Sequence, residues 1–97
     1  MANISNREVI YKYPLIQTDG FEIEMPKGAR ILTVQVQDGE PYIWAIVNPD
    51  NDTEVRGFRL AGTGHQLNTM GFTDMVYIGT FQLYDGGLVF HLFEIKY

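Results

Sequence analysis

Apolar and polar residues alternate with a period of two along most of this chain. Phe21, Ile23 and Met25, for example, alternate with two glutamates. Successive side chains of a strand point to opposite faces, so this period predicts strands with one buried and one solvated face. The same rule gives two further apolar faces, namely Val9, Tyr11, Tyr13 and Leu15, and Leu32, Val34 and Val36.

Turn signals divide this pattern into short segments. Asp-Gly pairs at 19–20, 38–39 and 85–86 are typical of hairpin turns, and the polar run 48–52 contains Pro49, which fixes φ. Residues 62–73 contain three glycines and are expected to form one long loop. The remaining segments predict an all-β fold of about seven antiparallel strands joined by hairpins, a small β-sandwich or barrel. These strands are expected at 8–15, 21–25, 30–37, 42–47, 54–60, 75–84 and 88–95.

Two of the predicted strands are apolar on both faces. They are residues 42–47 and 88–95, and in the latter Phe90 and Leu92 alternate with an equally apolar set. A strand with one solvated face does not carry this pattern, so a second sheet, a second subunit or a ligand must cover the other face. We predict a homo-oligomer whose interface is one face of the last strand, formed by Val89, His91, Phe93 and Ile95.

Length and composition favour one soluble domain, residues 1–97. The chain has 97 residues, and residues 1–7 are expected to form a loose N-terminus. The net charge of −5 has the wrong sign for a general nucleic-acid binder or for binding to an anionic membrane. No cysteine is present, and neither a signal peptide nor a membrane span is evident, so we expect a cytoplasmic protein without disulfides.

The most conspicuous local motif consists of Gly62, Thr63, Gly64 and His65. Two glycines let backbone amides approach a ligand closely, and a run of such amides can form an anion-binding nest. Thr63 and His65 would add side-chain donors. A glycine-rich turn without any ligand explains the same residues, so contact with phosphate or a nucleotide stays one of two interpretations.

A second candidate surface is aromatic. Trp44 and Tyr42 share a strand face, and a platform of this kind can stack a base. Arg56 or Arg59 could supply positive charge for a phosphate. The polar side chains on neighbouring strands that could border the platform are Gln35, Gln37, Thr80 and Gln82. Whether these residues face one another depends on the strand order, and a mixed polar and aromatic sheet surface without a ligand explains them equally well.

The residues that catalysis requires are sparse. The only serine is Ser5, close to the N-terminus, and there is no cysteine nucleophile. A metal site would need His65 and His91, the only histidines, together with a carboxylate such as Glu94 or Asp74, and Glu94 lies on the opposite strand face from His91. We therefore expect no enzymatic activity, no metal and no cofactor.

Six segments together resemble a known family. They are VIYKYPL (9–15), MPKGARIL (25–32), IWA (43–45), GTGH (62–65), IGTFQ (78–82) and LVFHLFE (88–94). In this order they resemble a short uncharacterised domain family of bacteriophages and of bacteria that carry prophages. The resemblance covers nearly the whole chain and implies no established reaction. It implies a small stand-alone protein of a phage or its host, and such proteins commonly bind a host protein or sequester a host defence signal.

Three hypotheses follow. The first is a phage-type, non-enzymatic, homo-oligomeric binding protein, with counter-defence as one use, that sequesters an anionic nucleotide-like ligand. Its ligand residues would be Gly62, Thr63, Gly64, His65, Trp44, Tyr42, Arg59 and Gln82. The second is a protein-interaction or virion-associated structural module whose acidic surface and last strand bind another polypeptide. The third is a small hydrolase that uses His65 and His91.

Overall fold

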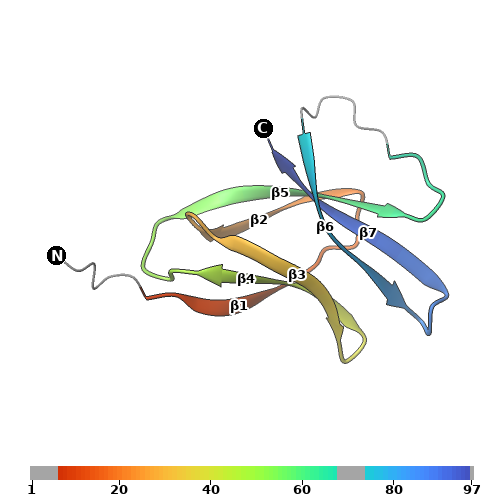
Figure 1. Ribbon diagram of the computed structural model, residues 1–97, viewed down its shortest axis with the longest axis horizontal. Helices are drawn as coiled ribbons and strands as arrows, with labels where there is room; N and C mark the ends of the chain where they lie inside the picture. The colour runs from red at the N-terminus through yellow and green to blue at the C-terminus, as the bar shows by residue number, and fades with distance from the viewer. Residues whose placement is uncertain (1–6, 68–73, 97) are drawn as a thin grey trace.

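Seven strands form two antiparallel sheets in the computed structural model, which describes residues 7–67 and 74–96 (Figure 1). Sheet A has the order β1-β4-β3, and sheet B has the order β2-β5-β7-β6. β3 and β6 contact each other without hydrogen-bonded pairing, so the sheets do not close and the architecture is sandwich-like. The all-β prediction is confirmed. The strands are β1 (Val9–Pro14), β2 (Gly20–Pro26), β3 (Arg30–Gln37), β4 (Glu40–Val47), β5 (Thr53–Gly62), β6 (Asp74–Leu83) and β7 (Leu88–Lys96).

Two of the predicted turns join hairpins, and two carry the chain between sheets. The pairs at 38–39 and 85–86 connect β3 to β4 and β6 to β7, and Asp38 and Gly39 adopt the positive φ of 51° and 81° that such turns need. The hairpin predicted at 19–20 is wrong, because β1 pairs with β4 and β2 pairs with β5. The Leu15 N–H donates to the carbonyl of Pro41, which keeps the chain beside β4 before it crosses. Residues 48–52 likewise lead from β4 to β5.

The core lies between the inner faces of the two sheets. Met25, Ile43, Phe58 and Leu92 are fully buried there, and the ring of Phe58 stacks on that of Phe21 at 5.4 Å. Where β6 approaches β3, a Cβ atom on Gly79 would lie 2.9 Å from the Val34 side chain. Glycine is therefore required for this close approach of the two sheets.

β1 departs from the predicted pattern. Val9 and Tyr11 lie on the inner face but are 36% and 44% exposed, and Ile10 on the outer face is 60% exposed. The prediction of one buried and one wet face is wrong for these residues, because β1 is an edge strand that packs mainly against β4. Only Tyr13 reaches the core, where burial raises the pKa of its unpaired hydroxyl.

A buried ion pair joins sheet B to the entrance of β3. The Arg56 guanidinium donates to both carboxylate oxygens of Glu94, with Nε at 2.5 Å from Oε2 and Nη2 at 3.2 Å from Oε1. Arg56 Nη1 also donates to the carbonyl of Ala29 at 2.9 Å. The hydrogen bond that Arg56 donates to Glu94 raises the pKa of Arg56, although burial opposes this. Since the two side chains are 14% and 7% exposed, neither charge is well solvated.

Removing one member of this pair should destabilise the fold. Glu94→Gln leaves a buried guanidinium without its main counter-charge, and breaking a buried pair in this way costs about 3 kcal/mol. We expect this loss in the free energy of unfolding measured by urea denaturation. The control is Glu22→Gln, which changes an exposed carboxylate and should stay within about 0.5 kcal/mol of the original chain. Equal losses in the two variants would contradict the assignment.

Candidate functional site

A chain of hydrogen-bonded side chains crosses the outer face of sheet B, the face turned away from sheet A. Tyr77 Oη lies 2.5 Å from Thr80 Oγ1, which lies 2.9 Å from His91 Nδ1. On the other side of the imidazole, His91 Nε2 lies 2.6 Å from Thr63 Oγ1. The backbone N–H of Thr63 donates to the carbonyl of Val89 at 3.1 Å. Residues from β6, β7 and the turn after β5 are thus connected.

A β-bulge brings two of these residues to the same face. Tyr77 and Thr80 are three positions apart, so in a regular strand they would point to opposite sides. The register of β6 against β7 shifts between Tyr77 and Gly79, so Tyr77 faces Phe93 and Thr80 faces His91. The extra residue reverses the alternation, as bulges do. Gly79 is the only sequence feature that hints at it.

The chain of side chains has two complete proton arrangements. In one, Tyr77 donates to Thr80, Thr80 donates to Nδ1, Nε2–H donates to Thr63, and Thr63 donates to the Val89 carbonyl at 3.5 Å. In the other, Thr63 donates to Nε2, Nδ1–H donates to Thr80, Thr80 donates to Tyr77, and the Tyr77 hydroxyl donates to solvent. Both satisfy the imidazole without a charged partner. The assembly therefore presents hydroxyl and imidazole groups that can exchange a proton or receive a hydrogen bond.

Aromatic and apolar groups border this polar chain. The ring of Tyr77 meets the ring of Phe93 edge-on, with centroids 5.7 Å apart, and Tyr77 is 57% exposed. At the Thr63 end lies a pocket of about 230 Å³, lined by Gly62, Thr63, His65, Gly87, Leu88, Val89 and Phe90. A small hollow therefore lies at the Thr63 end of this surface.

The Gly62–His65 motif lies at this hollow. The His65 ring packs so closely on Gly62 that a Cβ atom there would lie 2.7 Å from the ring. The N–H groups of Thr63 and His65 donate to the carbonyls of Val89 and Gly62, so they are not available for the predicted anion-binding nest. Gly64 supplies the positive φ of 86° that the turn requires. The turn therefore has a local structural role.

Arg59 lies on the same outer face but is buried, with 8% exposure. Its guanidinium donates to the backbone carbonyls of Asp19, Leu60, Gln66 and Leu67, at 2.5 to 3.4 Å. These bonds use the donors of all three nitrogens, so the predicted contact with a phosphate would have to replace them. They hold the segment after β5 against sheet B.

The aromatic platform lies on the other sheet. Trp44 and Tyr42 share the outer face of sheet A, and the predicted neighbours Gln35 and Gln37 lie beside them on β3. Lys12 covers the platform, since its ammonium lies 4.5 Å from the centre of the Tyr42 ring. Because the outer faces of two packed sheets point in opposite directions, Trp44 and the Gly62–His65 turn do not converge on one ligand within one chain.

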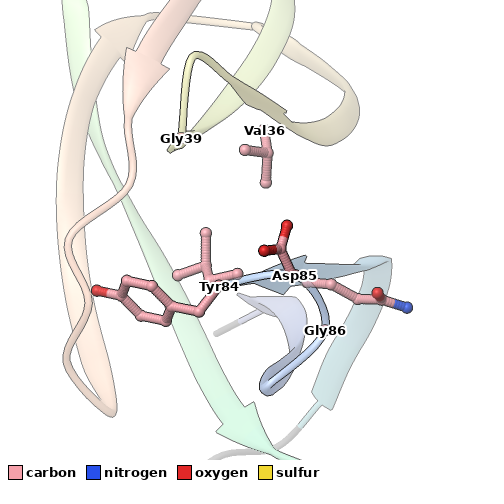
Figure 2. A pocket seen from close by; sticks show the side chains of 7 residues that line it. Val36, Gly39, Tyr84, Asp85 and Gly86 are labelled. Atoms are coloured by element: carbon pink, nitrogen blue, oxygen red, sulfur yellow. The ribbon is translucent and has the colours of Figure 1, made fainter.

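Gln82 lies on the outer face of sheet B, opposite Val89, and also lines a pocket at the end of β6. This pocket has a volume of about 480 Å³ and separates the β3–β4 hairpin from the β6–β7 turn, with the Asp85 carboxylate pointing into the gap (Figure 2). Asp85 is the only charged residue in the lining, which consists of Val36, Gly39, Gln82, Leu83, Tyr84, Asp85 and Gly86. A negative charge in this position disfavours an anionic ligand.

The predicted interface residues share one face of β7, as expected, but the chain itself covers part of that face. Ile95 is only 7% exposed, whereas Val89, His91 and Phe93 are half-buried. Self-association through these residues stays a prediction. Among residues 7–67 and 74–96, no group of three potential ligands could hold a metal ion. The same residues include no helix long and apolar enough to cross a membrane.

Replacing Arg59 tests whether this residue stabilises the fold or binds a ligand. Lysine keeps the charge but cannot reach four carbonyls in fork geometry, so Arg59→Lys should cost about 1 to 3 kcal/mol of unfolding free energy. The segment after Leu60 should also become more sensitive to limited proteolysis. Arg30→Lys, at an exposed arginine, is the matched control and should change neither quantity. Unchanged stability in Arg59→Lys would assign this residue to ligand binding.

Comparison with known proteins places the chain in a family. No curated protein and no solved structure matches it significantly. A family model described as a domain of unknown function (DUF7352) matches residues 6–97, which is nearly the whole chain and agrees with the resemblance to an uncharacterised family. The chain therefore belongs to this domain family of unknown function.

Proposed function

We propose that this chain is a non-enzymatic, homo-oligomeric binding module that recognises a second polypeptide through the outer face of sheet B. The observation that carries the proposal is the mixed aromatic and polar surface formed by Tyr77, Phe93 and the hydrogen-bonded Thr80, His91 and Thr63. Exposed tyrosine beside satisfied polar groups is typical of protein interfaces.

The size of the adjacent pocket favours a polypeptide over a small molecule. Small-molecule sites usually enclose about 300 to 1,000 Å³, whereas the hollow beside Thr63 holds about 230 Å³. So small a hollow encloses little of a small ligand, whereas the surface around it can contact a second protein chain. The larger pocket near Asp85 lies between the β3–β4 hairpin and the β6–β7 turn and carries a negative charge.

Charge indicates the chemistry of the partner. Glu22 and Glu24 lie on the outer face of β2, both exposed, and form no ion pair with any residue in the described ranges. Val55, directly opposite Glu24, is 55% exposed. These acidic and apolar side chains lie on the outer face of sheet B, and the net charge of the chain is −5. Both properties favour a partner polypeptide with a basic segment that also carries apolar side chains.

A nucleotide-like ligand has less support. The cations nearest to the predicted ligand residues are already engaged, since Arg59 donates to backbone carbonyls and Arg56 pairs with Glu94. Lys12 is the cation beside the platform, but it lies over the ring on which a base would stack. A nucleotide would have to displace it.

The resemblance to phage and prophage proteins supplies the biological part of the proposal. A small phage protein that binds a basic region of a host protein would be an accessory factor, and counter-defence is one such role. A virion-associated structural role fits the same surface. In either case the binding face is the same, so one set of variants tests both.

The binding face predicts a sharp difference between two neighbouring positions on β6. Tyr77→Lys places a positive charge in the centre of the surface and should abolish binding of peptides selected from a random displayed library. Val76→Lys is the matched control, because Val76 is 49% exposed on the opposite side of the same strand. We expect the peptides selected by the original chain to be basic and partly apolar, and to bind the control with unchanged affinity.

Either of two results would contradict this proposal. One is selection of peptides that bind the two lysine variants equally. The other is a calorimetric signal with nucleotides or cyclic nucleotides that is lost on substitution of Thr63 but not of Tyr77, since this would restore the small-ligand hypothesis.

A second candidate function is ester hydrolysis, favoured by the 2.6 Å contact between Thr63 Oγ1 and His91 Nε2. This geometry suits a nucleophile and its base, with Thr80 orienting the imidazole. Thr63 would attack a carbonyl carbon while Nε2 takes its proton and passes it to the leaving alkoxide, and water would then hydrolyse the acyl-enzyme. A hydroxyl in place of a carboxylate stabilises the imidazolium poorly, which makes this the weaker candidate.

Thr63→Val separates this candidate from binding. If Thr63 is a nucleophile, hydrolysis of p-nitrophenyl acetate by the original chain should exceed that by Thr63→Val by roughly a hundredfold or more. The loss of the contact with His91 should reduce stability by only about 1 kcal/mol. Equal rates in both proteins would remove the hydrolase hypothesis.

A further inference from the structure

We propose that the free edge of β1 pairs with β1 of a second copy of this chain, antiparallel and about a two-fold axis at Ile10. The pairing would join two A sheets into one continuous six-stranded sheet. The inference rests on the homo-oligomer of the proposed function and names the surface that forms it. The pairing of two β1 strands involves no polypeptide other than this chain, and it involves no residue of the outer face of sheet B.

The four edge strands of the two sheets differ in the accessibility of their edges and in the charges they carry. β3 and β6 lie against each other, with Val34 packed on Gly79. β2 carries Glu22 and Glu24 on one face, so two copies of β2 would bring like charges together. Of the described strands, only β1 combines an accessible edge with mixed charge, and it lies at the margin of sheet A (Figure 1).

β1 has the features of an edge strand that can pair with a further strand. Its first five residues are mostly apolar, yet Val9, Ile10 and Tyr11 are exposed on both faces. Alternate residues of an antiparallel strand direct their N–H and C=O groups to each side, and β4 pairs with one side only. Exposed edge strands with this composition are templates for pairing with another chain.

The sequence of β1 is complementary to itself in one register. With Ile10 opposite Ile10 of the second copy, Val9 lies opposite Tyr11 and Glu8 lies opposite Lys12, each twice. The two apolar pairs fall on the inner face and the two ion pairs on the outer face, since positions of equal parity share a face. An isologous two-fold interface requires this reciprocity.

Within a single chain, Glu8 and Lys12 form only surface contacts, and contacts across the edge of β1 can replace them. Glu8 bonds Arg30 at 3.3 Å, with side chains 46% and 63% exposed. Lys12 lies over Tyr42 and donates to the Gln37 side chain at the surface. Exposed contacts of this kind contribute roughly 1 kcal/mol or less, so pairing across the edge can replace them.

Cysteine cross-linking tests the register, because the chain contains no cysteine of its own. Ile10→Cys would place two sulfurs across the two-fold axis, where directly opposed Cα atoms are about 4.5 to 5.5 Å apart and a disulfide fits. Val9→Cys is the control, because in this register Val9 faces Tyr11 and not itself. Under mild oxidation we expect covalent dimers with Ile10→Cys and few with Val9→Cys. Equal cross-linking would overturn the register.

Charge reversal tests the interface in sedimentation velocity from micromolar to millimolar concentration. Glu8→Lys should raise the dimer dissociation constant by roughly tenfold or more, and Glu8→Lys with Lys12→Glu should restore it. Glu22→Lys changes the net charge equally, at the edge of the other sheet, and should leave the constant unchanged. Failure of the double variant to recover dimers would overturn the ion pairs.

The remaining outcomes separate this inference from the proposed function. A dimer that survives Ile10→Lys but dissociates in Phe93→Lys places self-association on β7, which overturns the pairing of β1 and leaves the homo-oligomer standing. A chain that is monomeric at every concentration overturns both. Dimerisation that depends on β1, with peptide binding that depends on Tyr77, supports the two independently.

Discussion

The structure depends on the burial of β5 on both faces. Five consecutive residues of β5, from 57 to 61, are buried, although a strand with one solvated side would bury alternate residues. Sheet A covers the inner side, where Phe58 and Leu92 are fully buried. On the outer side, Arg59 fastens the carbonyls of Gln66 and Leu67 over the sheet. A guanidinium in this position donates hydrogen bonds to loop carbonyls that would otherwise bond to water.

This arrangement also organises the candidate site. The segment that Arg59 fastens follows the turn that contains Thr63, and Thr63 is in turn bonded to His91 on β7. Two anchors on adjacent strands therefore fix the turn from both ends. The exposed part of the outer face begins where this cover ends, at Thr80, Tyr77 and Phe93. The same loop that stabilises the sheet thus defines the border of the surface that remains for a partner.

Local sequence signals were sufficient to predict the elements. The alternation around Ile23 and the Asp-Gly pair at 38–39 report backbone preferences of a few neighbouring residues, and these elements formed as expected. The pair at 19–20 shows the limit of such signals. It favours a reversal of the chain, but whether the next strand pairs with the preceding one depends on distant strands, here β4 and β5.

The site required information that the sequence does not carry locally. The bulge at β6 reverses the alternation after Tyr77, so a count of residues places Thr80 on the wrong face. The role of Arg59 depends on the path of a loop that has no periodic pattern. A cationic side chain beside a glycine-rich turn predicts an anion site equally well, until its donors are found on backbone carbonyls.

Periodicity and coverage are separate properties of a strand, and this chain shows the difference. β7 has no alternation, yet the chain itself covers Ile95 on its second face. The alternation of Val9, Tyr11 and Tyr13 in β1 predicts a buried face, yet Val9 and Tyr11 remain exposed because β1 is an edge strand that packs mainly against β4. Coverage depends on the strand order, which the hydrophobic pattern does not encode. The exposed apolar surface on which the proposed pairing with a second copy rests therefore lies on β1, although the alternation in β1 predicted a buried face.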